Sequence, residues 1–486
     1  MNDFEWFEPG ELADDDLTLL LTEKNPADPS KGYVPAYKFE MRHTVSRETI
    51  GTIDLRVGDT EPLRMYGGHV GYGVFSEFRG RRYVARACRL LLPLQNRTMR
   101  AFTTRRAPCW SKKEHKMHDL NQHPYFEKWS DPSSGVESFI LNERVAPVQQ
   151  SFYFTNVSIS PDENWLWFYA AFPPNLQKVL GVVSLDPRHP EIKLFPQAGF
   201  SSASPMVGAE SDAAYFCMGS SVYKVSVDGS TQVVCTVPEE YIGKRQFSRI
   251  ATHLTVSADG KYLLLDGDLG NFWWVGIGDI ATGEVKVLKE FGNHHNHAMF
   301  SPTDPKLFVI PEDWWNDKNS GRHFSYDHRM WLMDIEQTRY EVVRPKSWDS
   351  GHTASASHEW WSRDGMLCWN DYELGTYECD PYTLEATHVW KRPLCHAHCS
   401  SDRNLWCADE SPYKWDKKPV EILFFDRNRN TDLQIVSAMP KPPLPRGMYH
   451  IDPHPQFSPR DSWVVYTTTV RGKVDVALAP VRPLLA

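Results

Sequence analysis

Long hydrophobic runs are absent from this sequence of 486 residues. No stretch approaches the ~18 apolar residues that a membrane-spanning helix requires, so we expect no membrane partner. The first segment, from Met1 to Asp16, is acidic and lacks a basic stretch followed by an apolar one. It does not have the pattern of a secretory signal, and the sequence therefore favours a cytoplasmic protein.

The sequence also lacks an excess of positive charge. It has 53 Lys and Arg against 62 Asp and Glu, which gives a formal net charge of −9. Because binding to nucleic-acid phosphates requires a basic surface, we expect no nucleic-acid partner. The net charge does not predict the oligomeric state of the protein.

Cysteine is scarce as well. Nine cysteines, an odd number, are scattered along the chain. This pattern favours free thiols in a reducing compartment over a disulfide framework. Cys395 and Cys399 are close enough in sequence to bind one metal ion. Without a second cysteine pair, however, a structural role for both thiols is the favoured interpretation.

Aromatic residues, in contrast, are abundant, with 18 Trp, 20 Tyr and 24 Phe. Such residues suit broad β-sheets, and they also line clefts that bind carbohydrates. Composition alone does not separate these two uses.

A short motif recurs from about residue 150 onward. An apolar or aromatic strand leads into a Ser-x-Asp turn, and a second apolar strand follows. Each copy continues into a second hairpin. Repeated hairpin pairs are typical of a propeller, because a single four-stranded blade cannot bury both of its faces alone. The pattern predicts an all-β fold, a seven-bladed β-propeller over residues 124–486. Its seven copies begin at Val157, Val207, Leu254, Ala298, Glu359, His398 and Pro455.

The first 107 residues do not share this repeat. A strand is predicted from Thr49, and the segment from His69 predicts a strand, a turn and an amphipathic helix. Residues 39–95 resemble the acetyl-CoA-binding core of the GNAT acetyltransferases, where turn amides hold a pyrophosphate at a helix N-terminus. The strands that would complete that fold have no counterpart here. We therefore expect residues 1–107 to be a small, partial α/β segment with a structural role, joined by a linker at 108–123.

Histidines are unevenly placed: twelve of the 19 lie between His294 and His454. Most of them directly precede a Ser-x-Asp turn. Equivalent positions in successive blades surround one axis, so these groups should converge at one end of the central channel. One such histidine is usually a satisfied polar residue, but packing alone does not explain several groups. The groups are His294, His295 and His297; His352 and His358; His396 and His398; and His450 and His454.

The segment from His450 to His454 adds a carboxylate, Asp452. In an extended chain, residues at positions i, i+2 and i+4 point to the same side. Imidazole and carboxylate ligands together suit Mn, Fe, Ni or Zn, and spacing alone does not choose among these metals. With His358 from another blade, the segment predicts a site for a divalent metal.

Four segments carry a resemblance to a known family, and they occur in the same order along the chain. They are HAMFSP with His297, HRMWLMD with Arg329, SHEWWSRDG with His358, and DPHPQFSP with His454. These segments, within a stretch from about residue 124 to the end, resemble the oligogalacturonate lyases. The resemblance implies a lyase that shortens pectin-derived oligogalacturonides by β-elimination and leaves an unsaturated uronate. Its partner would be an acidic oligosaccharide.

The resemblance also implies roles for individual residues. The metal, Mn²⁺ in the family, would bind the uronate carboxylate and stabilise the enediolate-like charge that forms when the C5 proton leaves. His297 would be the neutral base that takes this proton, with Arg329 as a second catalytic residue. The metal ligands would include His358, His450, Asp452 and His454.

The sequence departs from the family at two ligand positions. The family's Gln falls on Tyr449, and the first His of its His-Pro-His-Pro segment falls on Asp452. Asp452 is an acceptable Mn²⁺ ligand, and His450 is available beside it.

A third departure concerns substrate binding. The family's substrate-binding Arg falls near Trp274, which leaves Arg245, Arg249 and Arg329 as candidate replacements. This loss favours either a related uronate substrate or a different hypothesis, a non-catalytic propeller that binds a sugar or a protein. An acetyltransferase based on the N-terminal segment is a third hypothesis, and the missing half of that fold argues against it.

Overall fold

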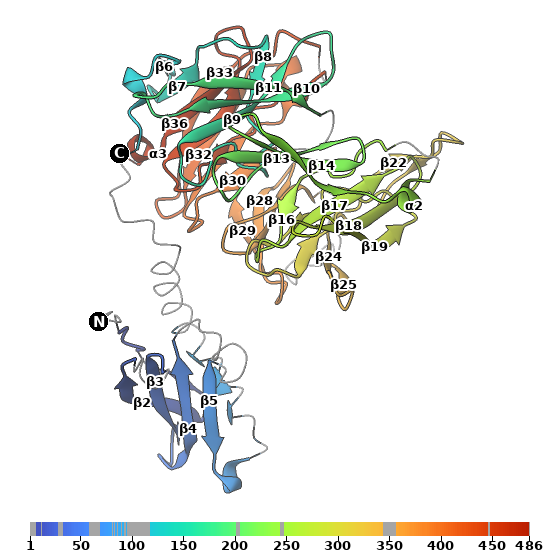
Figure 1. Ribbon diagram of the computed structural model, residues 1–486. Coiled ribbons are helices and arrows are strands. Elements are labelled where there is room, and N and C mark those ends of the chain that lie inside the picture. The colour runs from blue at the N-terminus through green and yellow to red at the C-terminus, as the bar shows by residue number, and fades with distance from the viewer. Residues whose placement is uncertain are drawn as a thin grey trace. The chain divides into compact units, whose positions relative to one another are not determined.

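A computed structural model of the chain divides it into two compact units, residues 1–116 and 117–486 (Figure 1). The residues that it describes are 6–10, 12–27, 33–57, 69–79, 81, 83–84, 86–88, 90–91, 94, 117–200, 205–243, 247–343, 356–445 and 448–485. Two residues singled out in the sequence, Arg245 and His352, and part of the expected linker, 108–116, lie outside these ranges.

The first unit is an antiparallel sheet of five strands in sequential order. Its strands are β1 Ala13–Asp14, β2 Leu17–Asn25, β3 Ala36–His43, β4 Thr49–Arg56 and β5 Val70–Val74, followed by the short helix η3 Ser76–Phe78. Alternate residues of β3, Tyr37, Phe39 and Met41, are buried on one face of the sheet.

A helix covers that face of the sheet. Residues between 83 and 94 are helical where they are described. Tyr83, Ala87, Leu91 and Leu94 share one side of this helix and join the sheet core. The predicted strand from Thr49, the second strand and the amphipathic helix are thus confirmed. The resemblance of this unit to acetyltransferases stays a prediction.

The second unit is a β-propeller with seven blades. The short helix η4 Leu120–Gln122 and the strands β6 Phe126–Ser130 and β7 Glu137–Leu141 precede its first blade. Blade 1 contains β8 Val148–Gln150, β9 Trp165–Ala171, β10 Lys178–Ser184 and β11 Ile192–Phe200. Blade 2 contains β12 Met206–Val207, β13 Ala213–Met218, β14 Ser221–Ser226 and β15 Thr231–Thr236. Blade 3 follows the helix α2 Glu239–Ile242 and contains β16 Thr255–Val256, β17 Tyr262–Asp268, β18 Trp273–Asp279 and β19 Val285–Phe291.

The next three blades follow the same plan. Blade 4 also carries a two-stranded hairpin, β22 Trp315–Asn316 and β23 His323–Phe324. Blade 4 contains β20 Met299–Phe300, β21 Leu307–Val309, β24 Trp331–Asp334 and β25 Tyr340–Val342. Blade 5 contains β26 Ala356–Trp361, β27 Leu367–Asp371, β28 Gly375–Cys379 and β29 Ala386–Trp390. Blade 6 contains β30 Ala397–Cys399, β31 Leu405–Asp409, β32 Val420–Asp426 and β33 Thr431–Met439, with the short helix η5 Pro412–Asp416 after β31.

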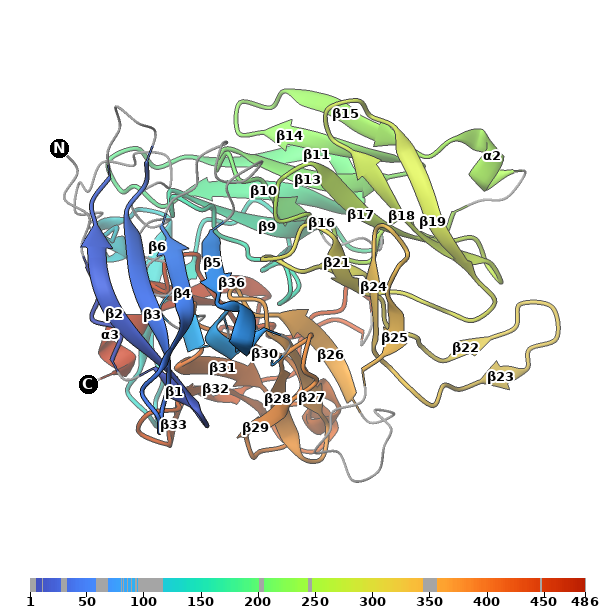
Figure 2. The ribbon, with the colours of Figure 1, turned by 90° about the horizontal axis from the view of Figure 1, so that it is seen from below.

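Blade 7 combines strands from both ends of the propeller unit. β34 Gln456–Phe457, β35 Trp463–Thr468 and β36 Asp475–Pro480 pair with β7 and β6, and α3 Val481–Leu484 follows. Ala477 pairs with Ile140, and Leu478 pairs with Phe139. This shared sheet closes the ring, and the successive blades follow one another around it (Figure 2). The prediction of an all-β, seven-bladed propeller is confirmed.

The Ser-x-Asp motif marks the turn between the first two strands of a blade. In blade 6 the Ser400 hydroxyl donates to Asp402 Oδ1 at 2.6 Å and accepts the Leu405 amide at 3.1 Å. Ser257 makes the same pair of contacts in blade 3. The motif recurs because serine and aspartate satisfy the turn's backbone groups locally.

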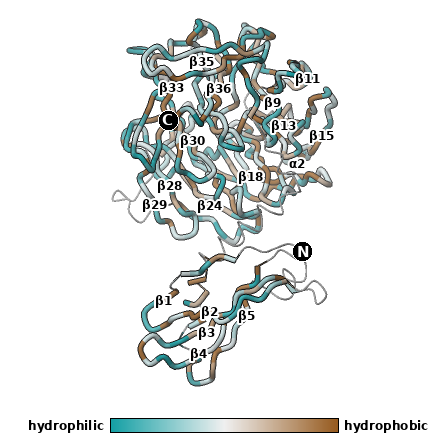
Figure 3. Tube along the Cα trace, turned by 90° about the vertical axis from the view of Figure 1, so that its left-hand side faces the viewer, coloured by the Kyte–Doolittle hydropathy of each residue, from teal (hydrophilic) through white to brown (hydrophobic). Residues whose placement is uncertain are grey.

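The core lies between neighbouring blades rather than within them. A cluster of buried apolar residues joins each blade to the next, as where Trp360 of blade 5 meets Trp406 of blade 6 at 6.2 Å. Hydrophobic segments recur along the strands, with hydrophilic segments between them (Figure 3). Much of the aromatic content is therefore structural. The fully buried tryptophans are Trp167, Trp274, Trp360, Trp369, Trp406 and Trp463. Within the described residues, no helix has both the length and the apolarity to cross a membrane.

Candidate active site

Five successive blades each bring a histidine to the propeller axis. They are His253, His297, His358, His396 and His454, which lie next to or within the inner strands of blades 3 to 7. The rings of His253 and His297 are 4.9 Å apart, and those of His396 and His454 are 4.4 Å apart. His358 lies 4.2 Å from His396. The tertiary structure thus gathers imidazoles that the sequence spreads over 200 residues.

The backbone at this site is strained. His297, His358, His450 and His454 have positive φ angles of 54°, 50°, 53° and 46°. Such angles are uncommon for residues other than glycine and cost on the order of 1–3 kcal/mol each. The left-handed conformation sets the direction of each side chain just before or within an inner strand. Strain that recurs at four clustered imidazoles indicates a functional site rather than packing.

Four side chains from blades 6 and 7 form a compact donor set. His396, His450, Asp452 and His454, called the tetrad below, each offer one ligand atom, and these atoms all lie within 4.8 Å of one another. His450 Nε2 is 3.0 Å from Asp452 Oδ2. His454 Nε2 is buried and has no hydrogen-bond partner among the described residues. An unpartnered buried nitrogen beside a carboxylate and two more imidazoles fits a divalent cation such as Mn²⁺.

Asp409, at the end of β31, orients two members of the tetrad. Its Oδ2 lies 2.9 Å from His396 Nδ1 and accepts the backbone amide of His454 at 3.1 Å. This bond places the proton of a neutral His396 ring on Nδ1, so the lone pair of Nε2 faces the other ligand atoms of the tetrad. Carboxylates orient metal-binding histidines in the same way. Although burial disfavours the charged imidazole, the Asp409 carboxylate raises the pKa of His396 well above its usual value.

Three of the four predicted metal ligands, His450, Asp452 and His454, lie in the tetrad. His358 lies outside it, next to His396. The fourth member, His396, was not among the predicted ligands, although its group was noted. Sequence could not choose between His396 and His398, because both precede the same turn. His398 instead accepts the Phe457 amide at Nδ1, at 3.1 Å, within the protein interior.

The route by which residues 450–454 converge differs from the predicted one. An extended chain was expected, but His450 and His454 have left-handed backbone angles, and the Asp452 amide donates to the His450 carbonyl at 3.1 Å. The segment is therefore kinked. The side chains meet because of these turns and not because of strand alternation.

His297, the predicted base, has a defined tautomer. Its Nδ1 lies 2.7 Å from Asn296 Oδ1, while Asn296 Nδ2 donates to Asp313 Oδ2 at 3.0 Å and so fixes the orientation of the amide. The shorter contact, to the Asn296 oxygen, favours the tautomer with the proton on Nδ1 and the lone pair on Nε2; in that tautomer the Arg329 Nη2 at 3.3 Å from Nδ1 is a close approach and not a hydrogen bond. Burial, with the neighbouring His253 and Arg329, lowers the pKa of His297 well below its usual value. The ring is a neutral imidazole that can accept a proton.

Arg329, the second predicted catalytic residue, is 4% exposed and fully engaged. Its guanidinium contacts Glu359 Oε1 and Asp313 Oδ1, each at 3.1 Å. Nη2 also lies 3.3 Å from His297 Nδ1. This geometry places the Arg329 charge beside the His297 ring.

Of the candidate replacements for the substrate-binding Arg, Arg249 lies near the site. Trp274 itself is a buried core residue of blade 3. Arg249 pairs with Asp268 at 3.2 Å and contacts His294 Nε2 at 3.1 Å. Its charge contributes, after burial, to the lowered pKa values of His253 and His297. Arg249 is therefore a cation whose charge acts on His253 and His297.

Two residues of the site were missed from the sequence. His253 directly precedes the repeat copy at Leu254, so the signal that marked the other histidines was present. Burial lowers the pKa of His253 to about 3, and neither of its ring nitrogens has a hydrogen-bond partner among the described residues. The Tyr153 ring lies 4.8 Å from His253 and 4.6 Å from His454. The rings of His253 and Tyr153 thus form a continuous series of contacts from His297 to His454.

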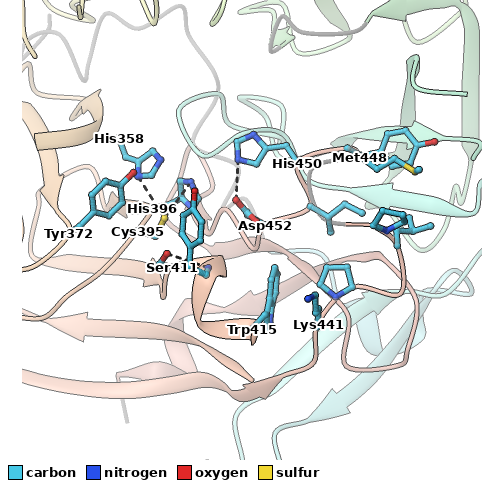
Figure 4. A pocket seen from close by; sticks show the side chains of 16 residues that line it. His358, Tyr372, Cys395, His396, Ser411, Trp415, Lys441, Met448, His450 and Asp452 are labelled. Atoms are coloured by element: carbon cyan, nitrogen blue, oxygen red, sulfur yellow. Dashed lines mark hydrogen bonds and ion pairs between the residues drawn. The ribbon is translucent and has the colours of Figure 1, made fainter. Parts of the chain in front are cut away.

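A cavity of about 260 Å³ opens beside the tetrad (Figure 4). His358, His396, His450 and Asp452 form one side of it. Other lining residues include three aromatic side chains and one lysine: Tyr372, Tyr413, Trp415 and Lys441. Lys441 Nζ pairs with Asp416 at 2.9 Å and is half-exposed. Aromatic faces with a cation suit an acidic sugar. His297 is not part of this lining.

Comparison of the sequence with known proteins confirms the resemblance to oligogalacturonate lyases. The chain is 24% identical over 221 residues to an oligogalacturonate lyase from Dickeya dadantii, a match that covers 42% of this chain and 54% of the relative. It is 24% identical over 228 residues to an oligogalacturonide lyase from Pectobacterium atrosepticum, with the same coverage. The chain thus spans about half the length of the curated relatives it matches. No model of a protein family matches it.

Solved structures show the same fold. An oligogalacturonate lyase in complex with manganese superimposes with a TM-score of 0.60 and 20% identity, over 73% of this chain and 96% of the other. The oligogalacturonate lyase from Vibrio parahaemolyticus gives a TM-score of 0.59 and 19% identity over the same shares. At this identity, the likeness establishes the propeller fold.

Proposed function

We propose that this chain is a metal-dependent lyase that cleaves oligogalacturonides, or a related uronic acid oligosaccharide, by β-elimination to an unsaturated uronate. One observation supports the proposal: four side chains that could hold a metal ion and a neutral imidazole, His297, belong to one cluster of rings at the inner strands, joined through His253 and Tyr153. The sequence relatives are lyases of this class. The cofactor of choice is Mn²⁺, since a structural neighbour is a manganese complex.

The tetrad would hold the metal ion. Bound there, Mn²⁺ supplies a positive charge that stabilises the negative charge developing on the uronate carboxylate. His450 has a side chain that is 59% exposed, whereas the Asp452 side chain is 8% exposed. The ion can therefore enter from the His450 side, and its inner ligands remain shielded from water.

His297 would take the C5 proton of the uronate at Nε2. The electron pair of the C5–H bond becomes the C4–C5 double bond, and the C4–O bond to the leaving sugar breaks. The leaving oxygen then takes a proton from solvent water, and His297 later returns its proton to solvent, which restores the neutral ring. Asn296 keeps Nδ1 protonated, and the charge of Arg329 disfavours protonation of the ring before substrate arrives.

The cavity beside the tetrad would bind the sugar chain. Its aromatic walls offer stacking faces, and Lys441 offers a positive charge at the rim. Arg249 and Lys441 are the cations that could recognise the acidic groups of the substrate in place of the missing Arg.

A non-catalytic binding platform is the second candidate. It is favoured because a buried Trp274 lies near the position of the family's substrate-binding Arg, and because the Arg329 guanidinium is already paired with Glu359 and Asp313. The histidines argue against it, because binding a sugar or a protein does not require strained imidazoles around a channel axis.

The test is an ultraviolet assay of the purified full-length chain with di- and trigalacturonate and added Mn²⁺. It follows the absorbance of the unsaturated uronate that β-elimination creates. We expect a rise that a chelator abolishes and added Mn²⁺ restores. A metallated chain that binds these sugars but gives no rise would instead support the binding platform.

A further inference from the structure

Lys178 lies on the histidine-bearing face of the propeller, in blade 1. It is the first residue of β10 and pairs with Ala171, which in turn pairs with Val148, the first residue of the inner strand β8. In blades 3 to 7 the histidines of the site lie before the inner strand or in its first half. Because the inner strands of a propeller run in the same direction, Lys178 belongs to the same face of the molecule as these histidines.

The Lys178 ammonium has aromatic neighbours but no counter-ion. Its Nζ lies 4.8 Å from the centre of the Tyr169 ring and 5.5 Å from that of Phe200. Among the residues that the structure describes, it makes no hydrogen bond and no ion pair. Burial lowers the pKa of Lys178 to about 8, and no described carboxylate acts to raise it. A partly buried cation without an anion is unfavourable, and a bound anion would offset that cost.

A second polar group without a partner belongs to the same side of blade 1. Gln150 pairs with Tyr169 across β8 and β9, so both side chains lie on one face of the sheet. Gln150 is 3% exposed, and its Nε2 donates to the Tyr449 carbonyl at 3.3 Å, which fixes the orientation of the amide. Its Oε1 is buried and has no hydrogen-bond partner within the described ranges. An ammonium and an amide oxygen together complement the carboxylate and the hydroxyl groups of a uronic acid.

A series of contacts joins Lys178 to the tetrad. The Lys178 ammonium lies over Tyr169, whose hydroxyl accepts the Tyr153 amide at 3.4 Å, and the Tyr153 ring is 4.6 Å from that of His454. After burial and the neighbouring histidines, the charge of Lys178 also contributes to the lowered pKa of His454. An ammonium cannot bind a metal ion. The charge of Lys178 is therefore beside the tetrad without belonging to its ligand set.

Lys178 also differs from the other cations considered for substrate binding. Arg249 pairs with Asp268 at 3.2 Å, and Lys441 pairs with Asp416 at 2.9 Å. Each of those cations already has a carboxylate partner. Of the three, Lys178 has the charge that a substrate carboxylate can pair with at no loss of an existing ion pair.

We propose that Lys178 and Gln150 bind a second acidic sugar of the substrate, next to the uronate whose carboxylate the tetrad metal would hold. The Lys178 ammonium pairs with the carboxylate of this second sugar, and the Gln150 amide oxygen accepts a hydrogen bond from a sugar hydroxyl. The inference rests on the proposed lyase function and deepens it. It defines the substrate as an oligosaccharide with acidic groups on two sugars.

Binding of trigalacturonate tests the site without turnover. Isothermal titration uses the full-length His297→Ala chain with Mn²⁺, in which the proposed base is absent. In this background Lys178→Met should lower the affinity at least about tenfold, because methionine keeps the packing on Tyr169 and Phe200 but removes the charge. Lys178→Arg, which keeps the charge, should restore the affinity to within about threefold.

Lys289→Met is the matched control in the same background. The Lys289 ammonium also lies over aromatic rings, 4.5 Å from the centre of Tyr340, but on the outer strand β19. This variant should bind trigalacturonate as the His297→Ala chain does. Equal affinities of Lys178→Met and Lys289→Met would overturn the proposal.

Mn²⁺ affinity separates substrate recognition from a structural role. Removing a positive charge beside the tetrad favours a bound cation, so Lys178→Met should bind Mn²⁺ at least as tightly as the His297→Ala chain. Parallel loss of Mn²⁺ and trigalacturonate affinity would show that Lys178 only supports the fold, and would overturn the proposal. Thermal melting checks that each variant is folded; if Lys178→Met is not, Lys178→Gln takes its place.

The outcomes also distinguish this site from the lyase function. If trigalacturonate binding depends on Lys178 but the unmodified chain gives no rise in ultraviolet absorbance, the site stands and the lyase function fails. If the absorbance rises but Lys178→Met binds normally, the lyase function stands and the site fails. Absence of trigalacturonate binding in the unmodified and His297→Ala chains alike would overturn the site.

Discussion

Individual histidines at this site carry two unfavourable features at once. His454 has a left-handed backbone with φ of 46° and a buried Nε2 without a hydrogen-bond partner among the described residues. A buried nitrogen of this kind costs about 1–3 kcal/mol, in addition to the backbone strain. A bound cation would offset both costs, because it supplies the missing partner. The strain is thus understandable as part of a metal site.

Replacing His454 by Ala should remove the metal and the activity together. We expect Mn²⁺ affinity to fall at least tenfold, because a buried ligand of the tetrad is lost, and turnover to fall in parallel. Metal content after desalting and the ultraviolet assay measure the two effects. Full metallation of His454→Ala would show that the ligand assignment is wrong.

Replacing His297 by Ala should separate catalysis from metal binding. Loss of a general base typically lowers the rate by about 10²–10⁴-fold, while Mn²⁺ content should stay unchanged because His297 is outside the tetrad. The control is His323→Ala, on the exposed hairpin strand β23, which should leave the rate as it was. Undiminished turnover in His297→Ala would remove this residue as the base.

At the scale of elements, the inner strands are short and the segments before them decide the site. β16, β20 and β34 each contain only two residues. The preceding loops are therefore held by side-chain bonds rather than by long ladders. Asp409 is the clearest case, since it accepts the backbone amides of both His396 and His454 and so joins blade 6 to blade 7.

Replacing Asp409 by Asn should loosen the metal centre without unfolding the blade. The amide no longer accepts from His396 on both oxygens, so the orientation of that imidazole is less fixed, and we expect Mn²⁺ affinity to fall about 10–100-fold. Isothermal titration of the chain with Mn²⁺ measures the change. Asp402→Asn, in the Ser400 turn of the same blade, is the matched control and should bind Mn²⁺ normally. Equal affinities in the two variants would contradict this role.

At the scale of the molecule, many imidazoles are held neutral inside one ring. Burial lowers the pKa values of His253 and His398 to about 3 and of His295 to about 4, against about 6.5 in an unfolded chain. Below pH 6.5 the unfolded chain therefore binds more protons than the folded one. The free energy of unfolding is therefore not reduced by these groups above pH 6.5, and it decreases as the pH falls below 6.5 because the unfolded chain takes up the protons. His396 acts in the opposite direction, since its pKa is raised.

The free energy of unfolding should consequently decrease between pH 7.5 and 5.5. Each of these three imidazoles contributes about 1.4 kcal/mol to the decrease, because its unfolded form gains a proton in this range. Urea denaturation of the chelator-treated chain, followed by tryptophan fluorescence, measures it. His398→Gln keeps an acceptor for the Phe457 amide but removes one titrating group, so its pH dependence should be shallower by about 1.4 kcal/mol. Identical pH dependence in both chains would argue against a neutral, buried His398.

The amino-acid sequence by itself determined the fold and the neighbourhood of the site. The Ser-x-Asp turn and its flanking strands are local patterns, and each is satisfied by its own side chains, as the Ser400 turn shows. Repetition of a local pattern fixes the number of blades. It also places a histidine before or within the inner strand of blades 3 to 7, so a cluster on the axis was predictable.

Only the tertiary structure decided which histidine of each group faces the axis. His396 enters the tetrad while His398 is buried in the protein interior, and His297 lies on the axis while His294 and His295 bond elsewhere. The choice depends on left-handed backbone angles and on contacts between blades far apart in sequence, such as the bond from His454 to Asp409. Side-chain direction in an irregular segment is set by what packs against it, and no local pattern encodes that.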